Sequence, residues 1–183
     1  MLLSILRPLL ARSKSRDQSS RQDGTPVSRL RFEKLNKDWN AEPNAPDPQI
    51  SISGSDVLLT FFLNHQLFKQ FDEEEIGIIR FTNCTSYRLG GTNDEGWYRG
   101  QCRYSKIAPE WGEFYEIHGD DPFRDSPTDW VQISSEKSAS RHFLFYLRDH
   151  TCEAIADGCV LEDDPRNALL RVAGLRLRQD RTG

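Results

Sequence analysis

The chain concentrates its aromatic residues, its turn glycines and its closest charges in one stretch, DEGWYRGQCRY at residues 94–104, which continues as APEWGEFYEI at residues 108–117. Side chains of an extended chain alternate between two faces, so Tyr115 and Ile117 would share one face while the intervening Glu116 lies on the other. We therefore expect two β-strands here, at 97–104 and 112–119, and take them as the centre of the fold.

Short apolar runs on either side of this centre are separated by turn residues. Gly54-Ser55 separates the runs 49–53 and 56–64, and a two-residue loop with glycine at its first position is typical of a β-hairpin. The run Val57–Leu63 is almost entirely hydrophobic, which indicates a strand covered on both faces. Further strands are expected at 76–81, 85–89, 130–133 and 141–148. The pattern predicts a mainly β fold, an antiparallel sheet folded as a sandwich or half-barrel, with an α+β arrangement as the alternative.

Length and composition allow one domain with a tail at each end. A chain of 183 residues with 37% hydrophobic content can bury one core. Residues 1–29 are basic and largely polar, so we expect a disordered tail there. The domain should span residues 30–162, with Trp39 anchoring the proline-rich path that follows it. Residues 163–183 form a second basic tail, in which 167–178 can form a weak amphipathic helix.

The net charge of −4 is unevenly distributed along the chain. Residues 32–162 carry 12 basic and 23 acidic side chains, a net charge of −11, and both tails are basic. Such a domain repels nucleic-acid phosphates, so nucleic-acid binding by the domain is not expected. The same field attracts a basic protein and raises its association rate. The charge therefore favours a basic protein as the partner, although surface charge can also serve solubility alone.

The cysteine pattern and the N-terminus indicate a cytoplasmic protein, with export as the lesser alternative. The four cysteines form no C-x-x-C pair and no zinc-site spacing, so free thiols in a reducing compartment are expected. The apolar run at 1–11 is broken by Arg7 and Pro8 and follows no basic region, unlike a signal peptide. No stretch approaches the roughly 20 apolar residues that a membrane-spanning helix needs.

The central stretch also carries the residue types of a protein-binding surface, because tryptophan, tyrosine and arginine dominate binding hot spots. The candidate partner-binding residues are Trp97, Tyr98, Arg99, Arg103, Trp111 and Tyr115. The competing interpretation is a β core with aromatic side chains at its rim, in which Arg99 and Arg103 pair with acidic residues of the neighbouring strand.

A second group of residues has the side-chain types of a metal site or a catalytic base. His118, Asp120 and Asp121 lie at the end of a predicted strand, where metal ligands or a general base are often presented; the alternative is a turn with solvated acids. Cys102 lies close to two arginines, which can activate a thiol, although a buried packing cysteine is the commoner case. No phosphate-binding loop, dinucleotide fingerprint or hydrolase motif occurs, so no cofactor is predicted.

Four segments resemble a group of small, uncharacterised bacterial proteins: FEKLN at 32–36, WNAEPNAP at 39–46, residues 93–117, and HFLFYLRD at 142–149. The resemblance covers residues 30–157 and implies a compact β-rich unit, but no activity, ligand or catalytic residue. In general character the unit is also similar to immunity proteins, which neutralise basic toxins. We therefore expect an acidic protein-binding module, in its sharpest form an immunity-like inhibitor of a basic partner. A small metal-dependent hydrolase using His118, Asp120 and Asp121 is the alternative.

Overall fold

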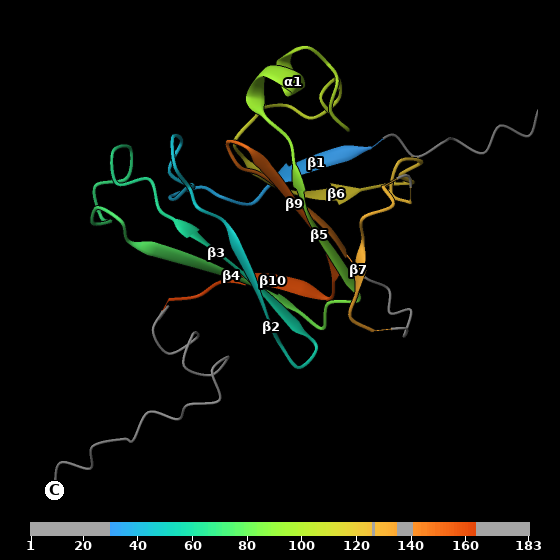
Figure 1. Ribbon diagram of the computed structural model, residues 1–183, viewed down its shortest axis with the longest axis horizontal. Coiled ribbons are helices and arrows are strands. Elements are labelled where there is room, and N and C mark those ends of the chain that lie inside the picture. Colours follow the sequence, from blue (N-terminus) through green and yellow to red (C-terminus); the bar gives the residue numbers. More distant parts are fainter. Residues whose placement is uncertain (1–29, 126, 135–140, 164–183) are drawn as a thin grey trace, which may run out of the picture.

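A computed structural model describes residues 30–125, 127–134 and 141–163 of the chain. These residues form two antiparallel β-sheets and one short helix (Figure 1). The elements are β1 (Arg31–Lys34), β2 (Gln49–Ser53), β3 (Asp56–Phe62), β4 (Ile76–Thr82), β5 (Ser86–Gly91), α1 (Asp94–Tyr98), β6 (Phe114–His118), β7 (Val131–Gln132), β8 (Arg141–Tyr146), β9 (His150–Ala156) and β10 (Gly158–Leu161). The predicted mainly β, antiparallel sandwich is confirmed. The predicted disordered tail at 1–29 and the predicted helix at 167–178 lie outside the described residues.

One sheet has six strands in the order β1-β6-β8-β9-β5-β7, and the other has four in the order β10-β4-β3-β2. The chain passes from the first sheet to the second at Asp157, between β9 and β10 (Figure 1). Strand β10 was not expected from the sequence; it pairs with β4 in the register Cys159↔Phe81. This connection links β9, an inner strand of the six-stranded sheet, to β10, an edge strand of the four-stranded sheet.

The main core lies between the two sheets and is rich in phenylalanine. Phe61 of β3 packs edge-on against Phe145 of β8, with ring centroids 5.2 Å apart, and Phe145 also contacts Phe114 at 5.1 Å. Trp39 packs against all three rings at centroid distances of 5.9–6.0 Å. The prediction that Trp39 anchors the proline-rich segment to the core is therefore confirmed.

The predicted hairpin between β2 and β3 is also confirmed. Ser53 pairs with Asp56, so that Gly54 and Ser55 form a two-residue loop, and Gly54 has a φ of +63°. Glycine adopts this left-handed conformation without the steric cost that a Cβ atom brings. Strand β3 is buried on both faces, as its hydrophobic run predicted, because Leu58 forms a buried cluster on the face opposite to the main core.

The predicted strand at 97–104 is wrong. The chain instead forms α1, whose N-cap Asn93 accepts a hydrogen bond from N of Gly96 at 2.8 Å. Asp94 and Glu95 occupy the first turn, where negative charge favours a helix. Turns follow as far as β6, and Trp97 and Tyr104 pack into a buried cluster from this folded connection and not from a strand. The second predicted strand is confirmed as β6.

Candidate functional site

The connection between β5 and β6 folds over the outward face of the six-stranded sheet (Figure 1). Its aromatic residues form a second, smaller core with side chains of β6 and β8. The buried members are Trp97, Tyr104, Ala108, Tyr115, Ile117, Leu144 and Tyr146. Beside this apolar cluster the same face of the sheet carries a network of charged side chains, which we call the buried charge network.

Glu153 of β9 is the centre of the buried charge network and is only 1% exposed. Its Oε1 accepts hydrogen bonds from Nη1 of Arg88, at 2.7 Å, and from Nη1 of Arg103, at 3.1 Å. Its Oε2 lies 2.9 Å from Nε2 of His142. Burial alone would raise the pKa of the Glu153 carboxyl, but His142 and the two arginines outweigh burial and hold that pKa below its ordinary value.

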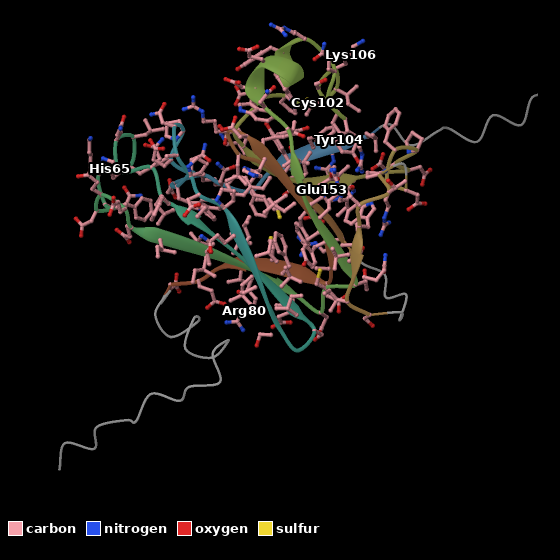
Figure 2. The ribbon with its side chains drawn as sticks, viewed as in Figure 1. His65, Arg80, Cys102, Tyr104, Lys106 and Glu153 are labelled. Atoms are coloured by element: carbon pink, nitrogen blue, oxygen red, sulfur yellow. The ribbon has the colours of Figure 1, made fainter. Side chains whose placement is uncertain are left out.

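Asp121, in the loop after β6, is the second buried carboxylate of the buried charge network. Its Oδ2 accepts a hydrogen bond from the hydroxyl of Tyr104 and lies 3.5 Å from Nδ1 of His142. Its Oδ1 accepts a hydrogen bond from N of Phe123 at 2.9 Å. Burial would raise the pKa of Asp121, but the contacts with His142 and Tyr104 and the Phe123 hydrogen bond lower it to about 2. In the view of Figure 2, Tyr104 lies between α1 and Glu153.

The contacts of the buried charge network hold separate parts of the fold together. Each carboxylate is engaged by cationic or hydrogen-bonding side chains, and Asp129 holds the remaining edge of the Arg88 guanidinium through two contacts of 2.9 Å. Burial raises the pKa of the Tyr104 hydroxyl, which therefore stays protonated at neutral pH. These contacts fasten the β5–β6 connection and the loop after β6 onto the sheet.

Acid titration of the network should destabilise the fold below about pH 4. Asp121 and Glu153 have lower pKa values in the folded protein than in the unfolded chain, where such carboxyls titrate near pH 4. Their contribution to stability is therefore fully present above about pH 4 and is lost as the pH falls toward about 2, the pKa of folded Asp121. Urea unfolding at about pH 6 and pH 3 measures this loss, which should be smaller in Asp121→Asn than in the wild type. Equal losses in the two proteins would contradict the assignment.

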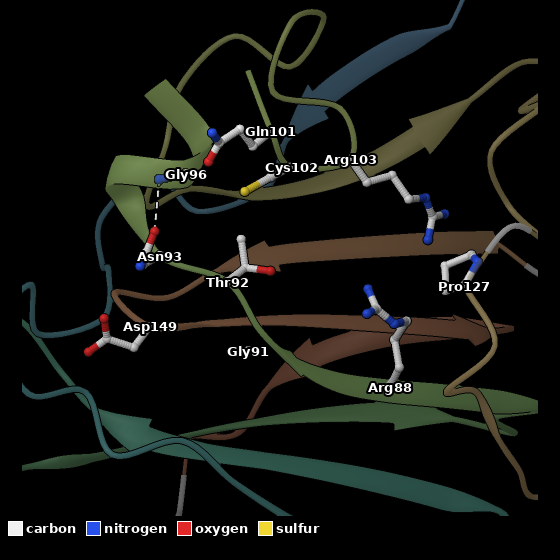
Figure 3. Close-up of a pocket in the computed structure, with 10 residues that line it drawn as sticks. All are labelled: Arg88, Gly91, Thr92, Asn93, Gly96, Gln101, Cys102, Arg103, Pro127 and Asp149. Carbon is white, nitrogen blue, oxygen red and sulfur yellow. Dashed lines mark hydrogen bonds between the residues drawn. The ribbon is translucent and has the colours of Figure 1, made fainter. Parts of the chain in front are cut away.

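An open pocket of about 670 Å³ lies between the end of β5 and the α1 connection (Figure 3). Arg88 and Arg103 point toward each other at one end, and Asp149 lies at the other. Cys102 also lines the pocket, and burial raises the pKa of its thiol. A raised pKa favours the protonated thiol, whereas a reactive cysteine needs the thiolate.

The structure divides the six candidate partner-binding residues between the interior and the surface. Trp97 and Tyr115 are 8% and 1% exposed and belong to the second core. Arg103 belongs to the buried charge network, and Trp111 is half-buried at the edge of the second core. Tyr98 and Arg99 project from α1; Tyr98 is 72% exposed, and Arg99 pairs with Glu95 within the same helix.

Two of the three residues of the metal-site alternative, His118 and Asp121, line one pocket of about 270 Å³ together with His142, and Asp120 does not line it. His118 lies 3.2 Å from a carboxylate oxygen of Glu33, Asp120 is exposed, and Asp121 turns inward to Tyr104. Over residues 30–125, 127–134 and 141–163, no group of three or more His, Cys, Asp or Glu side chains is arranged to hold a metal ion. Within the described residues, His118, Asp120 and Asp121 therefore do not form the three-ligand group that a metal ion requires.

Negative charge gathers at the end of the sandwich that carries α1. This acidic end consists of residues 36–48, 63–75, 92–99 and 147–149. Gln70 Nε2 donates to O of Asp38 at 2.6 Å, and Arg148 Nη1 donates to O of Asn44 at 2.9 Å. The turn between β8 and β9 also accepts a hydrogen bond from N of Thr92 at 3.0 Å. The four segments hold ten carboxylates and four lysine or arginine side chains, so the acidic end carries more than half of the domain's excess negative charge.

Comparison of the chain with protein-family models, with curated proteins and with solved structures gave no match. The part of the chain that the structure describes contains no helix that is long and apolar enough to cross a membrane.

Proposed function

We propose that this chain is an acidic protein-binding module that takes a basic partner at its acidic end. The observation that carries the proposal is the excess of carboxylates there, ten against four cationic side chains on segments joined by hydrogen bonds. Such a surface speeds the approach of a basic protein and fixes its orientation. An immunity-like inhibitor of a basic toxin is the sharpest form of this proposal.

Exposed apolar and aromatic side chains at the same end supply contact area for the partner. Tyr98 on α1 is 72% exposed and Leu67 in the β3–β4 connection is 67% exposed. Tyrosine combines an apolar ring with a hydrogen-bonding group, which suits an interface. Nucleic acid fits this surface poorly because its phosphates would meet the carboxylates. The four cysteines carry free thiols, which is consistent with a reducing, cytoplasmic compartment.

Native mass spectrometry of the protein isolated from its own host, at low and high salt, tests the proposal. We expect a stoichiometric complex with a basic protein that dissociates as salt screens the charges. The double variant Glu73→Lys/Glu74→Lys should weaken this complex by at least about tenfold, because it reverses two charges at the acidic end. The matched control Asp120→Lys/Asp125→Lys makes the same change in net charge on the loop after β6. Equal weakening by both variants, or a complex indifferent to salt, would contradict the proposal.

A further inference from the structure

A pocket of about 390 Å³ lies within the acidic end, between the 40–44 segment and α1. Its residues come from five separate parts of the chain: Asn40, Ala41, Glu42, Pro43, Asn44, Asn64, Asp94, Trp111, Gly112, Tyr146, Leu147 and Arg148. We propose that this pocket receives a lysine or arginine side chain of the basic partner. The inference rests on the proposed function and names the contact by which the partner is anchored.

The aromatic side of the pocket is formed by Trp111 and Tyr146. Their rings are stacked, with centroids 4.9 Å apart and planes inclined by 28°. Tyr146 is 1% exposed and supports the indole of Trp111, which is only half-buried and lines the pocket. The negative face of an indole ring attracts ammonium and guanidinium groups, and tryptophan is the strongest aromatic partner for them.

Two carboxylates complete the recognition of a cation. Glu42 lines the pocket from the 40–44 segment, and its Oε2 accepts hydrogen bonds from N of Asn44, at 2.7 Å, and from N of Ala45. Asp94 lines the pocket from the start of α1, and its Oδ1 accepts a hydrogen bond from N of Glu95 at 2.7 Å. These backbone contacts hold both carboxylates in place before a partner arrives, so little ordering is needed on binding.

The pocket also contains one cationic side chain, Arg148, which already has partners within the protein. Its Nη1 donates to O of Asn44 at 2.9 Å, and its Nε lies 3.7 Å from Oδ2 of Asp149. With Arg148 balanced by Asp149, the carboxylates of Glu42 and Asp94 leave the pocket negative. A pocket with an indole on one side and two carboxylates is complementary to a cation and unfavourable for an anion.

Titration of the full chain with N-acetyl-argininamide and N-acetyl-lysinamide, followed by the indole Nε1–H signal of Trp111 in NMR spectra, tests the inference. We expect saturable shifts of this signal. N-acetyl-citrullinamide has nearly the shape of the arginine probe without its charge, and it should bind at least about tenfold more weakly. No saturable shift with either cationic probe, or an equal response to citrulline, would overturn the inference.

A pair of double variants separates the pocket from the general charge of the acidic end. Glu42→Gln/Asp94→Asn removes both pocket carboxylates while keeping their shape, and should weaken binding of the cationic probes at least about tenfold. Asp38→Asn/Asp72→Asn removes the same charge at the acidic end outside the pocket and should have little effect. If the basic partner binds both variants equally well, the pocket inference is wrong and the proposed function stands. If no basic partner forms a complex at all, the proposed function itself is wrong.

Discussion

Replacing Glu153 by alanine is expected to lower the free energy of unfolding by about 3–5 kcal/mol, because it leaves buried cations without their counter-charge. Arg88 and Arg103 both donate to the same oxygen of Glu153, and His142 lies against the other oxygen. Without the carboxylate, these groups must either stay buried and unpaired or pull the β5–β6 connection away from the sheet. Urea unfolding at neutral pH measures the change.

Two further variants show whether charge pairing causes this loss. Glu153→Gln keeps the shape of the side chain and removes its charge, so it should retain most of the destabilisation. Glu95→Ala removes the exposed partner of Arg99 within α1, a pair that is screened by solvent and should contribute less than about 0.5 kcal/mol. A loss below about 1 kcal/mol for Glu153→Ala would show that the buried charge network does not hold the connection in place.

Replacing Phe145 by alanine is expected to cost about 3–5 kcal/mol, the range for removing a fully buried aromatic ring from a packed core. Phe145 is 0% exposed and contacts the rings of Phe61, Phe114 and Trp39. Its ring therefore joins both sheets to the segment before β2, and its removal leaves a cavity lined by three aromatic residues. The midpoint of urea or thermal unfolding measures the effect.

Phe123→Ala is the matched control for the core variant. Phe123 is 46% exposed and lies in the loop after β6, so the same truncation removes much less buried surface there. We expect a loss of less than about 1.5 kcal/mol for this variant. Similar losses for Phe123→Ala and Phe145→Ala would mean that the ring cluster between the sheets is not the main source of stability.

Most of the fold could be predicted from local patterns. The β2–β3 hairpin was recognised from Gly54-Ser55 because the loop conformation depends on those two residues alone. The failure at 97–104 has an equally local cause, since Asn93 as N-cap and the acids that follow it specify a helix start. A high density of aromatic residues is typical of strands, but here these residues cover the second core from a folded connection.

The buried charge network could not be predicted from any motif. Arg88 and Glu153 are 65 residues apart in the chain, and Arg103 and Glu153 are 50 apart. A usable signal did exist, because a single charged residue within an apolar strand, such as Glu153 in TCEAIA, indicates a buried and paired charge. The sequence does not reveal which partner each charge takes, since pairing depends on the strand order of the six-stranded sheet.

The sequence by itself determined that this protein is a mainly β, acidic domain, because strand periodicity, turn residues and net charge are local or additive properties of the chain. Only the tertiary structure decided which aromatic residues and which charges remain at the surface. Trp97 and Tyr115 are interior while Tyr98 is exposed, and the pocket at Trp111 forms from five separate segments between Asn40 and Arg148. Burial and convergence are set by how the two sheets and their connections pack, and no short stretch of sequence contains that information.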